Sequence, residues 1–372
     1  MRIGVPKEIK THEYRVGLTP AGVRELKSQG HEILVETQAG ASIGLSDAMY
    51  QNAGATMAKT AAQVFADAEM VVKVKEPQAI ECKLLREGQV LFAYLHLAPD
   101  PEQGKALVKS GCVAIAYETV SDGRGGLPLL APMSEVAGRM SIQAGAHAME
   151  KAQGGNGILM GGVPGVTPAN VLVIGGGVVG YNAARIAVGM GADVTIVDRS
   201  LARLNWLDQM FDGRLKTLYS TPDSLDHCIT QADLVIGAVL VPGAAAPKLV
   251  TRAHLKKMKP GTVVVDVAID QGGCVETSRP TTHQDPTYVV DGIVHYCVAN
   301  MPGGVARTST FALANATLPF VLALAGKGYR KALLDDANLS EGLNVHLGAI
   351  TYKAVADALG YDYQPIHEAL KP

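Results

Sequence analysis

The segment from Gly175 to Gly180 constrains the fold of this chain more than any other feature, because it reads GGGVVG and fits the pattern GxGxxG. The apolar run NVLVIG leads directly into it, and the helical pattern GYNAARIAVGMGA follows directly. In that setting Gly175 permits a tight turn, Gly177 lets a pyrophosphate approach the backbone, and Gly180 lets the helix pack closely on the strand. The N-terminus of the helix then presents free N–H groups to the phosphates. A purely structural glycine turn is the alternative, but it does not require this strand–turn–helix context.

Apolar runs recur through the middle of the chain at the spacing that is typical of a doubly wound sheet. The predicted strands alternate with helices or loops and cover residues 170–175, 193–198, 215–220, 233–239, 262–270 and 293–300. This succession matches the dinucleotide-binding fold. We therefore predict a Rossmann domain over residues 129–306.

Asp198 ends the second predicted strand of this domain. A carboxylate at that point accepts hydrogen bonds from the adenosine ribose and repels a 2′-phosphate, which favours NAD over NADP. Arg199 and Arg203 weaken the argument, because a nearby arginine can accept the phosphate. The loop Gly237–Gly243 lies at the same edge and either contacts the cofactor or is a plain structural loop. The predicted cofactor residues are Gly175, Gly177, Val178, Val179, Gly180, Asp198, Arg203, Ser220, Val239 and Leu240.

The first part of the chain also alternates between apolar runs and helical patterns. Its predicted strands are residues 2–5, 31–37, 69–75, 89–97 and 112–119. Near-continuous apolar strands with helices between them indicate a parallel sheet covered on both faces. The last residues show helical patterns at 308–324 and 349–359 and no further strands, so we expect them to pack on the first domain. The predicted fold class is α/β, with two doubly wound Rossmann-like domains and a cleft between them. The first domain, residues 1–128 plus 307–372, is discontinuous.

Composition excludes several other classes of protein. The formal net charge is −2, so there is no basic surplus to neutralise nucleic-acid phosphates. The five cysteines are scattered and form no CxxC, which indicates reduced thiols, no metal site and a cytoplasmic location. The N-terminus has no apolar signal core. The most membrane-like stretch, Phe311–Gly326, is short and interrupted by Asn315 and Pro319, so we predict a buried helix and no membrane partner.

Three basic residues in the first domain are candidates for substrate chemistry, since a small acid substrate needs a cation for its carboxylate and a group that transfers a proton. Arg15 follows the first strand, and the alternative is a surface arginine. Lys75 ends the third predicted strand, where Lys73 points to the same face and competes for the role. His96 lies near the end of QVLFAYLHL, and the alternative is a histidine of the core.

Two residues of the Rossmann domain join these candidates. Asp270 ends the strand TVVVDVAID, close to the expected place of nicotinamide, whereas Asp266 is expected to be a buried structural carboxylate. Asn300 ends the last strand and could also face the nicotinamide. All the candidates lie at the carboxyl edge of a predicted sheet, which is the usual place for a binding site.

Long motifs over essentially the full chain resemble the alanine dehydrogenase family. They are MRIGVPKEIKTHEYRVGLTPAGV, KVKEP, LFAYLHLA, APMSEVAGRMSIQAGA, VLVIGGGVVGYNAARIAVGMGADVTIVD, VDVAIDQGGCVETSRPTTH and VANMPGGVARTST. A similar fold unit occurs in the nucleotide-binding domain of proton-translocating transhydrogenase, and a related one in saccharopine dehydrogenase.

The resemblance implies NAD-dependent oxidative deamination of L-alanine to pyruvate and ammonia by a homohexamer. It assigns Arg15 and Lys75 to the substrate carboxylate and carbonyl, and His96 and Asp270 to catalysis. Further matching positions around the substrate and cofactor are Met133, Ser134, Asp198, Val298, Asn300 and Met301, of which Met133 could line a methyl pocket.

Two other functions fit the same cofactor motif. One is an NAD(H)-binding hydride-relay subunit of a transhydrogenase, and the other is a non-catalytic NAD-sensing module. The chain ends at Pro372 without a linker or membrane segment, and it has the whole substrate set at Arg15, Lys75, His96 and Asp270. A relay or a sensor would not require that set, so we expect a dehydrogenase.

Overall fold

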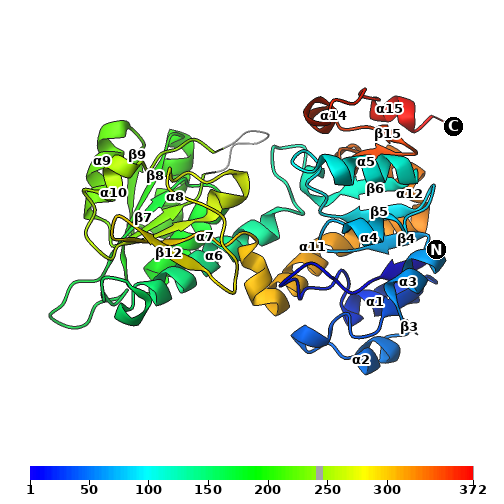
Figure 1. Ribbon diagram of the computed structural model, residues 1–372, viewed down its shortest axis with the longest axis horizontal. Helices are drawn as coiled ribbons and strands as arrows, with labels where there is room; N and C mark the ends of the chain where they lie inside the picture. The colour runs from blue at the N-terminus through cyan, green and yellow to red at the C-terminus, as the bar shows by residue number, and fades with distance from the viewer. Residues whose placement is uncertain (240–245, 372) are drawn as a thin grey trace. The chain divides into compact units, whose positions relative to one another are not determined.

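The computed structural model describes residues 1–239 and 246–371 and divides into two compact units. Unit 1 consists of Met1–Met133 and Val305–Pro372, and unit 2 of Ser134–Gly304. Each unit contains one sheet of mainly parallel strands flanked by helices (Figure 1). The predicted α/β class with two doubly wound domains is confirmed.

The sheet of unit 1 has eight strands in the order β15-β14-β6-β5-β4-β1-β2-β3. β1 to β6 run parallel to one another, and their order matches the Rossmann arrangement 3-2-1-4-5-6. The connections change direction between β1 and β4, which is the switch point where such sheets bind ligands. The strands are β1 (Arg2–Val5), β2 (Glu32–Glu36), β3 (Thr56–Ala58), β4 (Met70–Val72), β5 (Val90–Ala93), β6 (Val113–Ala116), β14 (Leu343–His346) and β15 (Ala349–Ile350).

The last two strands correct the expectation that the end of the chain adds no strands. β14 pairs antiparallel with β6 and with β15, so the tail extends the sheet of unit 1. Asn344 is buried within β14 and its amide donates to Thr119 Oγ1 at 2.8 Å. A short strand with a buried polar residue has no clear local pattern, so its pairing with β6 was not visible in the sequence.

The helices of unit 1 cover this sheet. The first of them, α1, begins as the sequence predicts, with Pro20 at its first position and Thr19 Oγ1 accepting from the N–H of Gly22 at 3.3 Å. The helices are α1 (Pro20–Ser28), α2 (Asp47–Asn52), α3 (Ala61–Asp67), α4 (Ala79–Cys82), α5 (Pro101–Ser110), α11 (Ala306–Lys327), α12 (Tyr329–Asp335), α13 (Ala337–Ser340), α14 (Lys353–Leu359) and α15 (Ile366–Ala369), with 3₁₀ turns η1 (Ala41–Ile43) and η2 (Tyr117–Thr119).

The stretch Met301–Lys327, which contains α11, is long and apolar enough to cross a membrane by length and composition. In the structure α11 packs against α1 and α12 of unit 1. Its buried residues include Ser309, Thr310 and Thr317 beside apolar ones, with Pro319 inside the helix. α11 is therefore a packed helix of unit 1.

The sheet of unit 2 has seven strands in the order β12-β13-β11-β10-β7-β8-β9. The six strands predicted from the sequence again follow the order 3-2-1-4-5-6, with the switch point between β7 and β10. The strands are β7 (Asn170–Ile174), β8 (Asp193–Asp198), β9 (Lys216–Tyr219), β10 (Leu234–Gly237), β11 (Val263–Asp266), β12 (Thr287–Val290) and β13 (Ile293–Tyr296). β12, which the sequence did not predict, pairs antiparallel with β13 at the edge.

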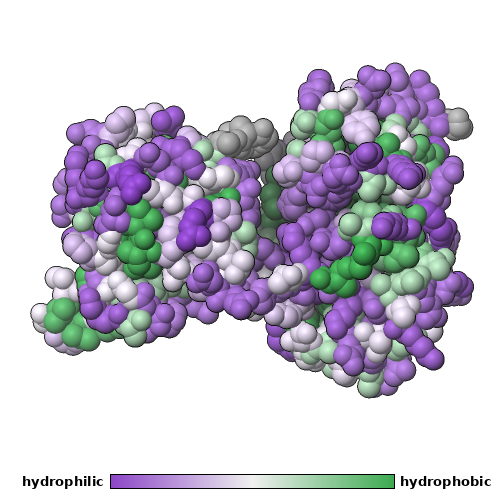
Figure 2. All heavy atoms as spheres, viewed as in Figure 1, coloured by the Kyte–Doolittle hydropathy of each residue, from purple (hydrophilic) through white to green (hydrophobic). Residues whose placement is uncertain are grey.

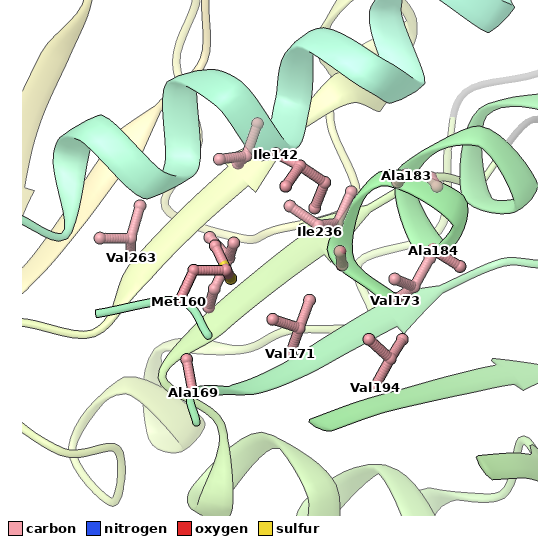
Figure 3. Close-up of a cluster of buried hydrophobic side chains, with 14 of the residues drawn as sticks. Ile142, Met160, Ala169, Val171, Val173, Ala183, Ala184, Val194, Ile236 and Val263 are labelled. Atoms are coloured by element: carbon pink, nitrogen blue, oxygen red, sulfur yellow. The ribbon is translucent and has the colours of Figure 1, made fainter. Parts of the chain in front are cut away.

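Alternate residues along the strands of unit 2 face opposite sides of its sheet. Val171 and Val173 pack with Ile142 of α6 in one apolar cluster, which Figure 3 shows between that helix and the strands. Leu172 and Ile174 belong to a second cluster. Both faces of the sheet are therefore covered. The helices are α6 (Ala131–Ala148, which begins in unit 1), α7 (Val178–Gly189), α8 (Leu201–Phe211), α9 (Pro222–Gln231) and α10 (Arg252–Leu255), with turns η3 (Lys151–Gln153), η4 (Val267–Gln271) and η5 (Met301–Val305).

Several strands are shorter than the sequence predicted, and this moves the candidate residues into loops. β4 ends at Val72, so Lys75 does not end a strand. β5 ends at Ala93, before His96, and β11 ends at Asp266, so that Asp270 lies in η4. Apolar residues continue past each strand end because the loops are also buried. The sequence therefore overestimates the length of these strands.

Candidate functional site

The glycine turn after β7 has the geometry that a dinucleotide site requires. Gly175 has φ of 102°, and a Cβ there would lie 2.7 Å from the carbonyl oxygen of Ala238. A Cβ on Gly180 would lie 1.8 Å from the carbonyl oxygen of Gly175, so only glycine lets α7 approach the strand. At Gly177, the N-cap of α7, a Cβ would meet nothing within 4 Å. The turn therefore leaves open space over the helix N-terminus, where a pyrophosphate would fit.

Asp198, at the end of β8, is fastened to this turn. Its Oδ2 accepts from the N–H of Gly176 at 2.7 Å, and its Oδ1 accepts from the N–H of Ser200 at 2.8 Å. Arg203 donates to the carbonyl oxygens of Gly176 and Gly177 and lies over the Trp206 ring, 4.0 Å from its centroid. Burial lowers the pKa of Arg203. The negative charge of Asp198 raises this pKa, but its effect is smaller than that of burial. A carboxylate oxygen can accept more than one hydrogen bond, so Asp198 can still accept one from a ribose hydroxyl.

Replacing Asp198 with alanine is expected to weaken NAD binding by about ten- to a hundredfold, because hydrogen bonds to a charged group contribute roughly 1.5–3 kcal/mol. The repulsion of a 2′-phosphate disappears as well, so NADP should bind relatively better beside Arg203. Fluorescence titration with both cofactors measures the ratio of their affinities. Asp193→Ala, at the other end of β8, is the matched control, since its carboxylate pairs with Lys216 at the surface. An unchanged NAD/NADP ratio in Asp198→Ala would show that Asp198 does not select the cofactor.

The other predicted cofactor residues differ in how much of each residue is exposed. Val178 is exposed and Val179 partly exposed in the first turn of α7, and Ser134 is partly exposed in α6. Ser220 is buried and its N–H donates to the carbonyl oxygen of Asp198 at 3.0 Å. The side chains of Val298 and Met301 are buried in the apolar core of unit 2. Val239 follows β10 and is partly exposed, whereas Leu240 lies outside the described residues.

Asp270 is exposed in η4, and two groups of unit 2 hold the segment that follows it. Asp266 is fully buried, as expected, and accepts from the N–H groups of Cys274 at 3.2 Å and Val275 at 3.0 Å. The ammonium of Lys248 donates to the carbonyl oxygens of the glycines at 272 and 273. Asn300 has φ of 63°, and its carbonyl oxygen lies 3.1 Å from Nε2 of His283.

The candidate residues of unit 1 follow three neighbouring strands. Arg15 comes after β1, Lys75 after β4 and His96 after β5, and these strands are adjacent in the sheet. Because the three are parallel, their carboxyl ends meet at one edge. Arg15 and Lys75 flank the switch point between β1 and β4, where doubly wound sheets bind ligands.

Arg15 is not a surface arginine: its side chain is 2% exposed and paired with the fully buried Glu13. Its Nε donates to Glu13 Oε1 at 2.7 Å, and its Nη2 donates to Glu13 Oε2 at 2.6 Å. Its Nη1 lies 3.1 Å from the sulfur of Met133, which is also buried. A substrate carboxylate would therefore share the guanidinium with Glu13.

Lys73 and Lys75, which compete for the same role in the sequence, differ in burial. Lys73 is fully buried, and its ammonium lies 3.0 Å from Glu8 Oε2 and 2.8 Å from Glu81 Oε1. Burial lowers the pKa of Lys73, but the two glutamates outweigh it and the net direction is upward. Lys75 keeps 13% of its side chain exposed, with Glu76 Oε2 3.9 Å from its ammonium. Lys73 is thus part of a buried ion network, and Lys75 remains the candidate for substrate.

His96 is exposed at 45% of its side chain, so it is not a histidine of the core. The imidazole stacks on Tyr94, with ring centroids 5.7 Å apart and an angle of 7° between the planes. Tyr94 is buried and its hydroxyl donates to the carbonyl oxygen of Leu129 at 2.5 Å. Burial raises the pKa of Tyr94, Arg15 lowers it and Glu118 raises it, so this ring lies near both.

Three glutamates that the sequence analysis missed each accept the backbone N–H of a candidate residue. Glu13 Oε1 accepts from Arg15 at 3.1 Å, Glu8 Oε1 from Lys75 at 3.3 Å, and Glu118 Oε1 from His96 at 2.6 Å. The signal that could have found them is a glutamate in each loop at the carboxyl edge, in PKEIK, THEYR and AYET. Carboxylates therefore organise the backbone of all three basic residues.

A hollow of about 780 Å³ lies between α4 and α5 of unit 1. Its described lining includes Lys10, Glu76, Lys83 and Lys105 and contains no arginine or histidine. It adjoins the Lys75 loop and offers lysine ammonium groups, but its described lining has neither the planar fork of an arginine nor a histidine to transfer a proton. The chemistry therefore points to the edge that carries Arg15, Lys75 and His96.

Comparison with protein families matches both parts of the chain. The family model described as "Alanine dehydrogenase/PNT, N-terminal domain" matches residues 4–137, and "Alanine dehydrogenase/PNT, C-terminal domain" matches residues 141–353. A protein of Halomonas elongata named alanine dehydrogenase is 63% identical over 363 residues, which are 98% of either chain.

Two solved structures extend the comparison. One titled L-alanine dehydrogenase superimposes with a TM-score of 0.94 at 51% identity, covering 97% of this chain and 99% of that one. A structure of transhydrogenase from Sinorhizobium meliloti superimposes with a TM-score of 0.81 at 27% identity, covering 95% of this chain and all of that one.

Proposed function

The chain belongs to the alanine dehydrogenase family, and from this premise we propose that it catalyses the reversible oxidative deamination of L-alanine to pyruvate and ammonia with NAD. It is an NAD-dependent oxidoreductase. The observation that carries the proposal is the placement of two sets of groups, each at the carboxyl edge of a sheet with the Rossmann strand order. Unit 2 presents an open glycine turn, and unit 1 presents two cations and a histidine.

The described residues of unit 2 fit NAD. Gly177 leaves open space over the N-terminus of α7, and Gly175 and Gly180 allow contacts that a side chain would block. The backbone N–H groups at this turn would hold the pyrophosphate, and Asp198 the adenosine ribose. When bound, NAD supplies the acceptor for the hydride, and the protein supplies binding, orientation and proton transfer.

Arg15 and Lys75 are proposed to bind the substrate. Arg15 would bind the carboxylate while it stays paired with Glu13, so the guanidinium is already oriented before substrate arrives. Lys75 would place a positive charge at the carbonyl oxygen of pyruvate or at the hydroxyl oxygen of the carbinolamine. Met133, whose sulfur touches Arg15, would line the space for the methyl group. A substrate with one carboxylate and one small apolar side chain suits this set.

His96 and Asp270 are proposed to assist the exchange of ammonia and water at the same carbon. The exposed imidazole of His96 would donate a proton as the oxygen leaves and accept one when water enters. Asp270, also exposed, would orient the ammonia or water. Asn300 is proposed to contact the substrate side of the nicotinamide.

The hydride-relay function is less supported. A relative named alanine dehydrogenase is 63% identical over 98% of the chain, whereas the transhydrogenase structure is 27% identical. A relay between two nucleotides also has no use for a paired arginine, a lysine and an exposed histidine at one sheet edge.

NADH formation across a panel of amino acids tests the proposal. L-alanine should react fastest, and L-serine and 2-aminobutyrate should react slowly, because a small pocket distinguishes one added group by only about 1–3 kcal/mol. Glutamate and lysine should be very poor, since Arg15 and Lys75 are already engaged by the substrate carboxylate and carbonyl, and the space beside Met133 is small and apolar. Ammonia released is measured in the same assay.

A preference for a dicarboxylic or long basic amino acid would reject L-alanine while leaving an NAD-dependent dehydrogenase. Hydride exchange between two nucleotides without any amino-acid oxidation would favour the relay. NAD binding without either activity would favour a sensor.

We also propose that the protein is a cytoplasmic homohexamer, as the resemblance implies. Figure 2 shows apolar patches within the mainly hydrophilic visible surface. In unit 2, Leu159, Val163 and Val166 are 65%, 53% and 63% exposed, and an assembly would have reason to bury them. The five cysteines are free, and burial raises the pKa of Cys82 and of Cys112 to about 11 each, which suits a reducing compartment. The mass in solution by light scattering tests the oligomeric state.

A further inference from the structure

The backbone of His96 adopts a conformation that needs support. Its φ is 47°, in the left-handed region that residues other than glycine rarely adopt. Since 45% of the side chain is exposed, burial of the imidazole does not hold it there. Residues persist in such conformations only where the surrounding structure determines them strongly.

Glu118 supplies one part of that support. It lies in η2, directly after β6, and β6 is the neighbour of the strand β5 that leads to His96. Its Oε1 accepts from the N–H of His96 at 2.6 Å, and both of its oxygens lie 3.2 Å from the N–H of Leu95. One carboxylate thus accepts hydrogen bonds from two successive N–H groups, and these bonds hold the backbone in the turn. Its Oε1 is also 3.9 Å from Nδ1 of His96.

Tyr94 supplies the other part. Its ring lies almost parallel to the imidazole, at 7°, and packs edge-on against Tyr117, with centroids 5.1 Å apart. Tyr117 directly precedes Glu118. The two residues that hold His96, one at its backbone and one at its ring, are therefore connected through the buried Tyr117.

We propose that Glu118 is a positioning residue for the proton transfer, which sets the left-handed turn at His96 and thereby fixes the imidazole over the ring of Tyr94. The proposal rests on the proposed function, in which His96 moves the proton. Glu118 itself does not touch substrate in this proposal. It acts through His96, and that dependence separates it from a carboxylate that only stabilises the fold.

Replacement of Glu118 tests the proposal by steady-state kinetics. Glu118→Ala should lower kcat with L-alanine by about 10- to 100-fold, as the loss of a carboxylate that orients a metal-bound histidine typically does. NAD affinity should change less than about twofold, since the cofactor site is in unit 2. Glu118→Gln keeps an oxygen that can accept the two N–H groups, so it should recover most of kcat. If Glu118→Ala does not fold, Glu118→Asp, which withdraws the carboxylate by one methylene, replaces it and should also lower kcat.

A double-mutant cycle with His96→Ala gives the decisive result. Because Glu118 acts through His96, Glu118→Ala should cause no further loss of kcat, within about twofold, once the imidazole is absent. Losses that multiply would overturn the proposal, as would a normal kcat in Glu118→Ala. Glu69→Ala is the matched control, since Glu69 accepts the N–H of Arg2 at 2.6 Å at the opposite edge of the same sheet. It should leave kcat within about twofold.

A readout independent of turnover separates this proposal from the proposed function. The ring resonances of His96, assigned by NMR from their loss in His96→Ala, should shift in Glu118→Ala and much less in Glu118→Gln. Unchanged resonances would overturn the positioning role. A wild-type protein that oxidises no amino acid would reject the proposed function, and the NMR comparison would still decide whether Glu118 positions His96.

Discussion

Replacing His96 with alanine is expected to lower turnover by about 10²–10⁴-fold, the usual contribution of a positioned acid or base. NAD binding should not change, because the cofactor turn lies in unit 2. The folded state should also tolerate the change well, since the imidazole is 45% exposed and leaves no buried cavity. Stopped-flow and steady-state measurements of NADH formation give the loss, and the ionisation that belongs to the proton transfer should disappear from the pH profile of kcat/KM.

The control for this variant is His367→Ala. His367 lies in α15 with 74% of its side chain exposed, so it has comparable chemistry without a place at the sheet edge. Its removal should leave kcat and KM unchanged. Nearly normal turnover in His96→Ala would mean that another group transfers the proton.

Replacing Arg15 with alanine is expected to reduce both stability and substrate binding. The guanidinium is the partner of Glu13, whose side chain is 0% exposed. Removing one member of a buried ion pair typically costs about 3–5 kcal/mol, because the other charge remains buried. Chemical denaturation should therefore show a large loss in the free energy of unfolding.

Arg15→Lys separates binding from stability. It keeps a positive charge near Glu13 but loses the planar fork that donates from Nε and Nη2. The kcat/KM for pyruvate should fall by about 10²-fold or more, since charge-assisted hydrogen bonds contribute roughly 1.5–3 kcal/mol each. The dissociation constant of NADH should stay close to the wild-type value.

The double variant Glu13→Gln/Arg15→Ala is the matched control for this pair. Neutralising Glu13 removes the buried charge that Arg15→Ala leaves behind, so much of the lost stability should return. Substrate affinity should not return with it. A variant at Arg15 that binds pyruvate normally would remove Arg15 from the substrate site and leave it as part of a structural ion pair.

Local patterns in the sequence determined the class of fold and the cofactor turn. The glycine spacing reports a backbone requirement, which the structure expresses as φ of 102° at Gly175 and the 1.8 Å approach at Gly180. The apolar runs identified the parallel strands of both sheets except β3 (Thr56–Ala58), because a buried strand leaves a near-continuous apolar run along the chain itself. Neighbouring residues carry this information, so it can be read without knowing the tertiary structure.

The tertiary structure alone decided what surrounds each side chain. Lys73 and Lys75 lie on the same predicted strand, and only the approach of Glu8 and Glu81 shows which of them is buried in an ion network. The sequence left His96 open between core and site, and its exposure depends on where β5 ends.

The carboxylate of Glu118 meets His96 because β6 lies beside β5, and β14 joins the sheet by pairing with β6 across more than half of the chain. These environments arise from strands that are distant in sequence and adjacent in space. No local periodicity encodes such contacts, since strand pairing and side-chain burial are settled only when the whole sheet has formed.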